Sequence, residues 1–311
     1  HLCDRRQRQM CIRDRVIIMV KFFVLSRFIA RFYKSNIVFL YFLVTSHNFT
    51  VYFQKGFFMI NSNTFSNFNS KYPIYADLHT HSISSGHGSE DTITDMIRCA
   101  SESGLSLFGI SDHGPATSSS AKPSYFQSLK LADRDRFGIR VLYGAELNII
   151  NTAGDVDLDD DTLSTLDYAI ISIHPPIFKP YHDKDLSSAY IRAMDHPKVR
   201  FLGHIDDARF PVDFEYLLEI AKEKHVYPEI NNGSLMPDAY RINGQENCRR
   251  ILSICKKLDL PVLLSSDSHG KKNIGNMQYI FPLLEELDFP AHLVLNSDLS
   301  ALSDIILSLI H

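Results

Sequence analysis

The sequence predicts an α/β fold with a parallel sheet, in one domain that begins near Tyr75. The first observation is that short apolar runs alternate with longer segments of helical periodicity, giving seven strand–helix units without an internal repeat or a long linker. The second is an ordinary globular composition, with 45% hydrophobic and 22% charged residues among 311. Such units fit either an open sheet or a barrel related to the eight-stranded one.

Each predicted strand is a short run of branched and aromatic side chains, and each predicted helix repeats apolar residues every three or four positions. Asp91 and Asp213 are expected to cap helix N-termini, and Gly104 to end the first helix. The acidic run 155–161 is expected to be a solvated turn. The predicted strands cover residues 74–78, 107–110, 141–145, 168–173, 201–203, 226–230 and 262–264, and the predicted helices 92–103, 124–137, 187–194, 213–225, 245–258, 277–287 and 298–310.

Residues 1–58 differ from the rest of the chain. They hold ten Lys or Arg against two Asp or Glu, a net charge of +8, whereas the remainder holds 22 against 34, a net charge of −12. One interpretation is a membrane anchor, because residues 35–54 carry no Lys, Arg, Asp or Glu and are long enough to span a bilayer. The Ser, Asn, Thr and His residues in that stretch weaken it as a spanning helix.

Two other interpretations of this segment compete with the anchor. The run Met-Cys-Ile-Arg-Asp-Arg at 10–15 matches a translated sequencing adaptor, and the stretch after it resembles translated AT-rich non-coding DNA. Met59 would then be the natural start. The third interpretation is a disordered or loosely helical extension. We favour a non-native or disordered extension over 1–58 and a functional domain over 59–311, which a mass spectrum of the natively expressed protein would check.

The overall charge and the cysteine count limit the class of function. A net charge of −4 argues against a dedicated nucleic-acid binder, which usually carries a basic excess, so no stable nucleic-acid partner is expected. The five cysteines have no paired spacing, which favours a reducing, cytoplasmic compartment over a disulfide framework. No membrane association is expected if residues 1–58 are not native. The fourteen histidines are unusually many, and histidine is the commonest metal ligand.

His, Asp and Glu residues gather where the predicted strands end. In a parallel barrel these ends meet on one face, where active sites of such folds lie. His79 and His81 alternate along an extended chain, so both imidazoles point the same way. Imidazole and carboxylate without cysteine suit Zn, Mn or Fe, and a carboxylate such as that of Glu146 can bridge two ions. The candidate ligands are His79, His81, His87, His113, Glu146, His174, His204, Asp267 and His269, which is enough for two or three ions.

Six ordered motifs make the chain from Tyr75 onward resemble the polymerase-and-histidinol-phosphatase (PHP) superfamily, and within it the stand-alone phosphatases of the YcdX type. They are Asp-Leu-His-Thr-His at 77–81, Asp-His-Gly-Pro at 112–115, Gly-Ala-Glu-Leu-Asn-Ile at 144–149, His-Pro-Pro at 174–176, Glu-Ile-Asn-Asn at 229–232 and Ser-Asp-Ser-His at 266–269. The resemblance implies a distorted seven-stranded (β/α) barrel with a trinuclear metal site at the C-terminal ends of its strands.

The resemblance also implies which residues hold each of three divalent ions, with zinc expected first and manganese or iron as alternatives. No ligand position is missing, although Gly-His-Ile-Asp at 203–206 replaces a His-Pro pair around the fifth-strand histidine. One ion would take His79, His81, Glu146 and Asp267, a second His87, His113 and His269, and the third Glu146, His174 and His204.

The implied activity is hydrolysis of a small phosphorylated metabolite, a phosphomonoester, by a metal-activated hydroxide. Asp267 and Glu146 are expected to be catalytic through the ions they hold. Arg241 is our first choice for a phosphate contact, with Lys179 and His182 as weaker choices. The alternatives are a histidinol phosphatase, a 3′–5′ exonuclease or phosphodiesterase of the same superfamily, a metal-dependent amide hydrolase and a non-catalytic metal-binding domain. A homo-oligomer is compatible with the sequence.

Overall fold

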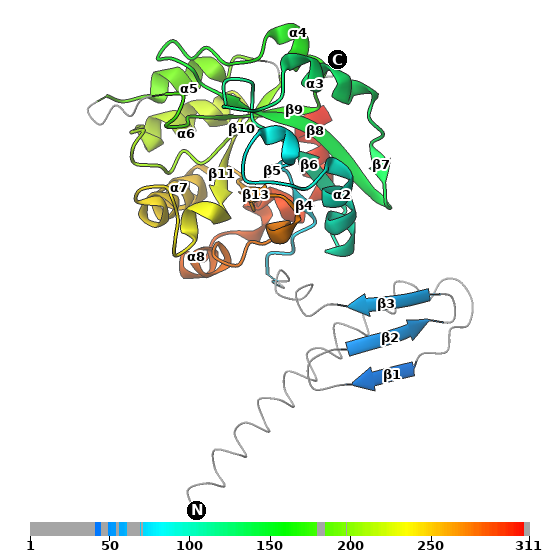
Figure 1. Ribbon diagram of the computed structural model, residues 1–311. Coiled ribbons are helices and arrows are strands. Elements are labelled where there is room, and N and C mark those ends of the chain that lie inside the picture. The colour runs from blue at the N-terminus through cyan, green and yellow to red at the C-terminus, as the bar shows by residue number, and fades with distance from the viewer. Residues whose placement is uncertain are drawn as a thin grey trace, which may run out of the picture. The chain divides into compact units, whose positions relative to one another are not determined.

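The computed structural model describes residues 41–44, 49–53, 56–60, 69, 71–178, 184–196 and 198–307 (Figure 1). The chain divides into two compact units, residues 1–62 and 63–311. In the first unit, β1 (Tyr41–Val44), β2 (Phe49–Phe53) and β3 (Gly56–Ile60) form an antiparallel sheet in that order. Strands β1 and β2 therefore lie inside the stretch 35–54 that one interpretation expected to be a spanning helix. No helix of the described residues has the length and apolarity to cross a bilayer.

The second unit contains the predicted α/β fold, a nearly closed barrel of seven parallel strands surrounded by helices (Figure 1). The predicted strands are confirmed in number and order, with ends that shift by a few residues. In sheet order the strands are β4 (Ala76–Asp77), β6 (Leu107–Ile110), β8 (Ile139–Asn148), β9 (Tyr168–Ser172), β10 (Val199–Leu202), β11 (Tyr227–Asn231) and β12 (Leu263–Ser265).

The helices follow the predicted segments except in two places: residues 124–137 do not form one helix, and a short helix covers Asp160–Leu163, where none was predicted. The α-helices are α2 (Ile93–Glu102), α3 (Pro123–Ser128), α4 (Asp160–Leu163), α5 (Ser187–Ala193), α6 (Phe214–Glu223), α7 (Gly244–Leu258), α8 (Phe281–Glu286) and α9 (Leu299–Leu307). Short 3-10 turns are η2 (Ile83–Ser85), η3 (Leu129–Leu131), η4 (Asn232–Leu235), η5 (Lys271–Asn273), η6 (Ala291–Leu293) and η7 (Leu295–Ser297).

The prediction of a single helix over 124–137 is wrong. Helix α3 and η3 end at Leu131, and β7 (Asp135–Arg136) then pairs with the start of β8. Phe137 and Gly138 both have positive φ angles, of 50° and 80°, so they form the two-residue hairpin loop that joins these strands. The Phe-Gly pair, rather than the helical spacing of the residues before it, decides the local structure.

Two capping predictions have different outcomes. Asp213 caps α6, accepting a hydrogen bond from the backbone N–H of Tyr216, as predicted. Asp91 does not cap α2, because Thr92 takes that place in a capping box with Asp95. Asp91 instead accepts the backbone N–H of Lys271 at 2.9 Å and pairs with that lysine's ammonium, which ties α2 to the loop after the last strand.

The barrel interior is filled by a cluster of apolar side chains, of which Tyr168 is one of the largest. Tyr168 on β9 is fully buried, and its hydroxyl donates to the carbonyl of Leu78 after β4. Gly109 and Gly144 leave room for this ring, because a Cβ at either position would lie within 2.8 Å of Tyr168 atoms. At the N-terminal end of the barrel, α9 adds Leu302 and Ile306 to the same apolar cluster.

Strands β4 and β12 are the two ends of the strand order and do not pair with each other, so the barrel closes between them through contacts outside the main sheet. Directly after these two strands, β5 (Thr80–His81) and β13 (Ser268–His269) pair in parallel, which joins two histidine motifs. Below that pair, the buried side chain of Asn296 bridges the gap. It accepts the backbone N–H of Leu264 at 2.7 Å and donates to the carbonyls of Leu264, at 2.7 Å, and Ala76, at 2.8 Å.

We expect Asn296→Ala to lower the free energy of unfolding by about 3 kcal/mol or more, because three buried backbone groups would lose their partners at once. Urea denaturation followed by circular dichroism measures this change. A loss below about 0.5 kcal/mol, the size of an ordinary surface substitution, would show that the seam does not need this side chain.

Candidate metal centre

The strands bring eight of the nine candidate ligands to the C-terminal mouth of the barrel. Each of these lies at or just after the end of β4, β6, β8, β9, β10 or β12. His79, His81 and Glu146 are fully buried, whereas His87, in the loop after η2, is exposed. His87 still reaches the cluster, since its ring centroid lies 4.9 Å from that of His113 and 5.1 Å from that of His269.

The carboxylate of Glu146 lies at the centre of this cluster. Ring nitrogens of five histidines surround its two oxygens within 3.6 Å, approaching from four different strands and from β5. The distances to a Glu146 oxygen are 2.6 Å for His113 Nδ1, 2.8 Å for His204 Nε2, 3.3 Å for His174 Nε2, 3.4 Å for His79 Nε2 and 3.6 Å for His81 Nε2.

Asp267 forms a second wall of the cluster. Its Oδ1 lies 3.2 Å from His81 Nε2, 3.7 Å from His79 Nε2 and 3.8 Å from His269 Nδ1. Asp267 and His204 both have a left-handed backbone, with φ angles of 51° and 29°. Few side chains adopt that conformation without strain, and such residues gather at functional sites.

The polar atoms of this cluster lack partners in a way that fits bound cations. Among the described residues, the buried atoms His79 Nε2, His81 Nε2, His113 Nε2 and His269 Nε2 make no hydrogen bond. A buried polar atom without a partner costs about 1–3 kcal/mol, so four ring nitrogens at one place need an explanation. Three groups offer ligand atoms within 4.8 Å of one another: His81, His113 and His269; His79, His81 and Asp267; and His113, Glu146 and His174.

Outer hydrogen bonds fix which ring nitrogen of these histidines faces the centre. His79 Nδ1 lies 2.6 Å from Glu229 Oε1, and His269 Nδ1 lies 3.1 Å from the carbonyl of Asp267. Both partners accept, so each Nδ1 carries a hydrogen, and Nε2 is the nitrogen of each ring that can bind a metal once it is deprotonated. Glu229 also accepts the backbone N–H of His204 at 2.7 Å, so one carboxylate orients two candidate ligands.

The same arrangement at His174 corrects, at one residue, the prediction that the acidic run 155–161 is a solvated turn. His174 Nδ1 lies 2.7 Å from Asn148 Oδ1, and the amide of Asn148 donates to Asp157 Oδ2 at 2.6 Å. Asp157 is largely enclosed and packs so close to Gly114 that a Cβ there would lie 2.3 Å from its carboxylate. Asp157 is therefore enclosed beside the amide that orients His174, whereas Asp155, Asp159, Asp160 and Asp161 are exposed as predicted.

The pKa values in the cluster are set by two effects: burial, which disfavours the charged form of each group, and the charges of the neighbouring carboxylates and imidazoles. Burial alone would raise the pKa of Glu146, but the imidazoles of His174, His79 and His113 hold it well below its usual range. Burial opposes the charge of His79, yet Glu229, Glu146 and Asp267 raise its pKa well above the usual value. Burial, together with His113 and His269, lowers the pKa of His81 well below its usual value. Neighbouring histidines in this site therefore differ in charge.

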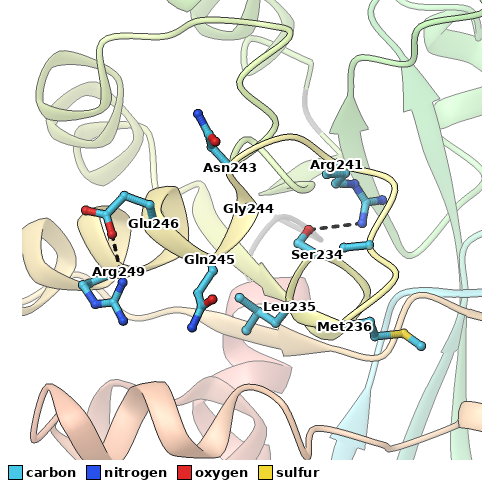
Figure 2. A pocket seen from close by; sticks show the side chains of 10 residues that line it. Ser234, Leu235, Met236, Arg241, Asn243, Gly244, Gln245, Glu246 and Arg249 are labelled. Atoms are coloured by element: carbon cyan, nitrogen blue, oxygen red, sulfur yellow. Dashed lines mark hydrogen bonds and ion pairs between the residues drawn. The ribbon is translucent and has the colours of Figure 1, made fainter.

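Arg241 contacts this cluster from the loop between η4 and α7. Its Nη2 lies 2.7 Å from Asp267 Oδ2, and its Nη1 donates to Ser234 Oγ at 3.2 Å (Figure 2). Arg241 also lines a cavity of about 350 Å³, shown in Figure 2, with Leu235, Met236, Gln245 and other residues. Its guanidinium is thus positioned between a candidate ligand and an open cavity.

The other predicted residues have different places. Asp77 accepts the hydroxyl of Ser266 and the backbone N–H of Gly275, and burial raises its pKa to about 6. Asp112 accepts hydrogen bonds from the Ser82 and Tyr125 hydroxyls and lies behind the histidines. Neither carboxylate is among the candidate ligands, and both accept hydrogen bonds from the segments around the centre. Lys179 and His182 lie outside the described residues.

The chain is similar in sequence and fold to several known proteins. The family model for the PHP domain matches residues 77–233. A protein of Clostridium acetobutylicum named "probable phosphatase" is 37% identical over 222 residues, which are 71% of this chain and 90% of that protein. One of the same name from Acetivibrio thermocellus is 33% identical, over 74% of this chain and 94% of its own. The fold resembles a histidinol phosphate phosphatase of Lactococcus lactis, solved with zinc, L-histidinol and phosphate, with a TM-score of 0.50 and 20% identity over 69% of this chain and 94% of that one.

Proposed function

The chain belongs to the PHP domain family, and on that premise we propose that it is a metal-dependent phosphatase that hydrolyses a small phosphomonoester. The observation that carries the proposal is the group of buried, unpartnered imidazole nitrogens around the carboxylate of Glu146. Relatives named probable phosphatases support the reaction class. The mixed imidazole and carboxylate donors support zinc first, with manganese or iron as alternatives.

We assign the ligands of three divalent ions to the nine candidate residues. Glu146 would bridge two ions, which accounts for its central place among five histidines. When bound, such ions lower the pKa of a water molecule and neutralise the charge of the phosphoryl oxygens. The assigned sets are His79, His81, Glu146 and Asp267 for the first ion, His87, His113 and His269 for the second, and Glu146, His174 and His204 for the third.

The chain itself then has to bind the phosphate and the alcohol portion of the substrate. Arg241 is the cation that we assign to the phosphate, because a guanidinium donates two parallel hydrogen bonds to phosphate oxygens. Its bond to Asp267 aims the guanidinium at the centre before substrate arrives. His182 remains our proposal for a further contact. All assigned residues belong to the domain over 59–311, so we propose that residues 1–58 take no part in the reaction.

The test is hydrolysis of para-nitrophenyl phosphate by protein that is stripped with a chelator and reloaded with zinc, manganese or iron in turn. Turnover should require the metal and should disappear in Asp267→Ala. Loss of turnover together with loss of bound metal in that variant supports the proposal. Metal-independent turnover, or a wild-type protein that binds no metal in any of the three reloadings, would falsify it.

Replacing Arg241 separates a phosphate contact from a role in folding. We expect Arg241→Ala to lower kcat/KM about a hundredfold, since a buried charged hydrogen bond to the substrate is worth about 1.5–3 kcal/mol. Arg241→Lys keeps the charge but not the paired donors, so it should recover only part of the rate. Steady-state kinetics with both variants measures this. Unchanged KM and kcat in Arg241→Ala would remove the residue from the site.

A further inference from the structure

Ser85 is a buried serine whose hydroxyl lies between two candidate ligands. It is the last residue of η2, four positions after His81. Its Oγ donates to Asp112 Oδ1 at 2.7 Å, accepts the backbone N–H of His113 at 3.1 Å, and lies 3.0 Å from His81 Nδ1. A hydroxyl has one hydrogen to donate and two lone pairs to accept with. These three contacts therefore use its whole capacity.

The direction of each bond follows from Asp112. Its carboxylate is fully engaged, because Oδ1 also accepts the backbone N–H of Ser82 at 2.6 Å, and Oδ2 accepts the hydroxyls of Ser82, at 2.8 Å, and Tyr125. A carboxylate with four donors around it can only accept, so the single hydrogen of Ser85 is directed to it. The Ser85 oxygen is then left as an acceptor toward His81 Nδ1.

His81 has a competing place for its ring hydrogen. A neutral imidazole carries one N–H, and His81 Nε2 lies 3.2 Å from Asp267 Oδ1, an acceptor that would attract the hydrogen to that side. An Nε2–H group cannot bind a metal ion. Without an acceptor at Nδ1, the His81 ring would therefore carry its hydrogen on Nε2, and Nε2 would have no lone pair to offer to a metal ion.

We propose that Ser85, oriented by Asp112 and Tyr125, is a positioning residue that holds the hydrogen of His81 on Nδ1 and so keeps Nε2 free to bind metal. The bond from the His113 backbone adds a second effect, because the same hydroxyl fixes the loop after β6. The rings of His81 and His113 stack beside it with centroids 4.2 Å apart and planes 22° apart. One serine thus sets the tautomer of one ligand and the place of the next.

The experiment compares Ser85→Thr with Ser85→Val, two side chains of nearly equal shape of which only the first keeps the hydroxyl. Metal-free full-length protein labelled with ¹⁵N-histidine reports the tautomer of each ring by NMR. We expect Nδ1–H at His81 in the wild type and Ser85→Thr, and Nε2–H in Ser85→Val. Zinc affinity, measured by competition with a chromophoric chelator, should fall about 10- to 100-fold in Ser85→Val only.

Ser172→Ala is the matched control. Ser172 is also fully buried, but its hydroxyl has no hydrogen-bond partner among the described residues, so deleting it should change neither the His81 tautomer nor zinc affinity. The inference rests on the proposed metal site, yet the tautomer is read without metal. A wild type that shows Nδ1–H but binds none of zinc, manganese and iron overturns the proposed function and leaves the tautomer assignment intact. Equal tautomers and equal zinc affinities in Ser85→Thr and Ser85→Val overturn the role of Ser85.

Discussion

Glu146→Gln is expected to lower kcat/KM for phosphomonoester hydrolysis by about three orders of magnitude and to remove bound metal. The glutamine has almost the same shape, so the change isolates the negative charge at the centre of five imidazoles. An amide cannot bridge two cations, and several kcal/mol of charge stabilisation would be lost, each 1.4 kcal/mol being a factor of ten in rate. Steady-state kinetics and metal analysis by mass spectrometry measure the two losses.

The control for this change is Glu223→Gln, the same substitution at an exposed position at the end of α6. It should keep both the rate and the metal content of the wild type. Thermal unfolding of metal-free Glu146→Gln should stay cooperative, because a neutral side chain is easier to bury than a charged one. If Glu146→Gln kept its full metal content and lost less than about tenfold in rate, Glu146 would not be the bridging ligand.

The strands and the candidate ligands were predictable because their signals are local. Each ligand lies within a few residues of an apolar run, and the carboxyl ends of parallel strands must meet on one face. The hairpin at 135–139 shows the limit of such signals, since two residues with positive φ decided against a helical spacing that extended over 124–137. The spacing of apolar residues indicates which face of a helix would be buried. Whether the chain turns instead depends on the backbone conformation of one or two residues, here Phe137 and Gly138.

The acceptors behind the histidines could not be predicted, because they act across the barrel. Glu229 and the His79 ring it orients are 150 positions apart in the chain, and Asn296 bridges to Ala76 across 220. Asp157 was misread since an acidic run is usually solvated, and only the fold brings Asn148 to it. A serine such as Ser85 carries no sequence signal at all. These residues determine the tautomers of the histidines and the closing of the barrel between β4 and β12. The sequence therefore predicts which residues form the candidate site, but not how their rings are oriented.

The affinity for metal is expected to rise about tenfold for each unit of pH between 6 and 8. We expect His79 to carry a proton in the metal-free protein, because Glu229, Glu146 and Asp267 raise its pKa well above the usual value despite its burial. A metal ion that binds through Nε2 must displace that proton, so binding becomes easier as the proton concentration falls. His81 adds no proton of its own, since its pKa is lowered and the ring is already neutral.

Calorimetric titration of the chelator-treated protein with manganese, in buffers of different ionisation enthalpy, counts the protons released at each pH. At least one proton per protein should appear at pH 6. Glu229→Gln should release fewer, because it removes the carboxylate nearest to His79, at 2.6 Å. An affinity that does not change from pH 6 to 8 would mean that His79 is neutral before metal binds. In that case a cation other than protonated His79 would balance the negative charge of the carboxylates. Arg241 is a candidate, because its Nη2 lies 2.7 Å from Asp267 Oδ2.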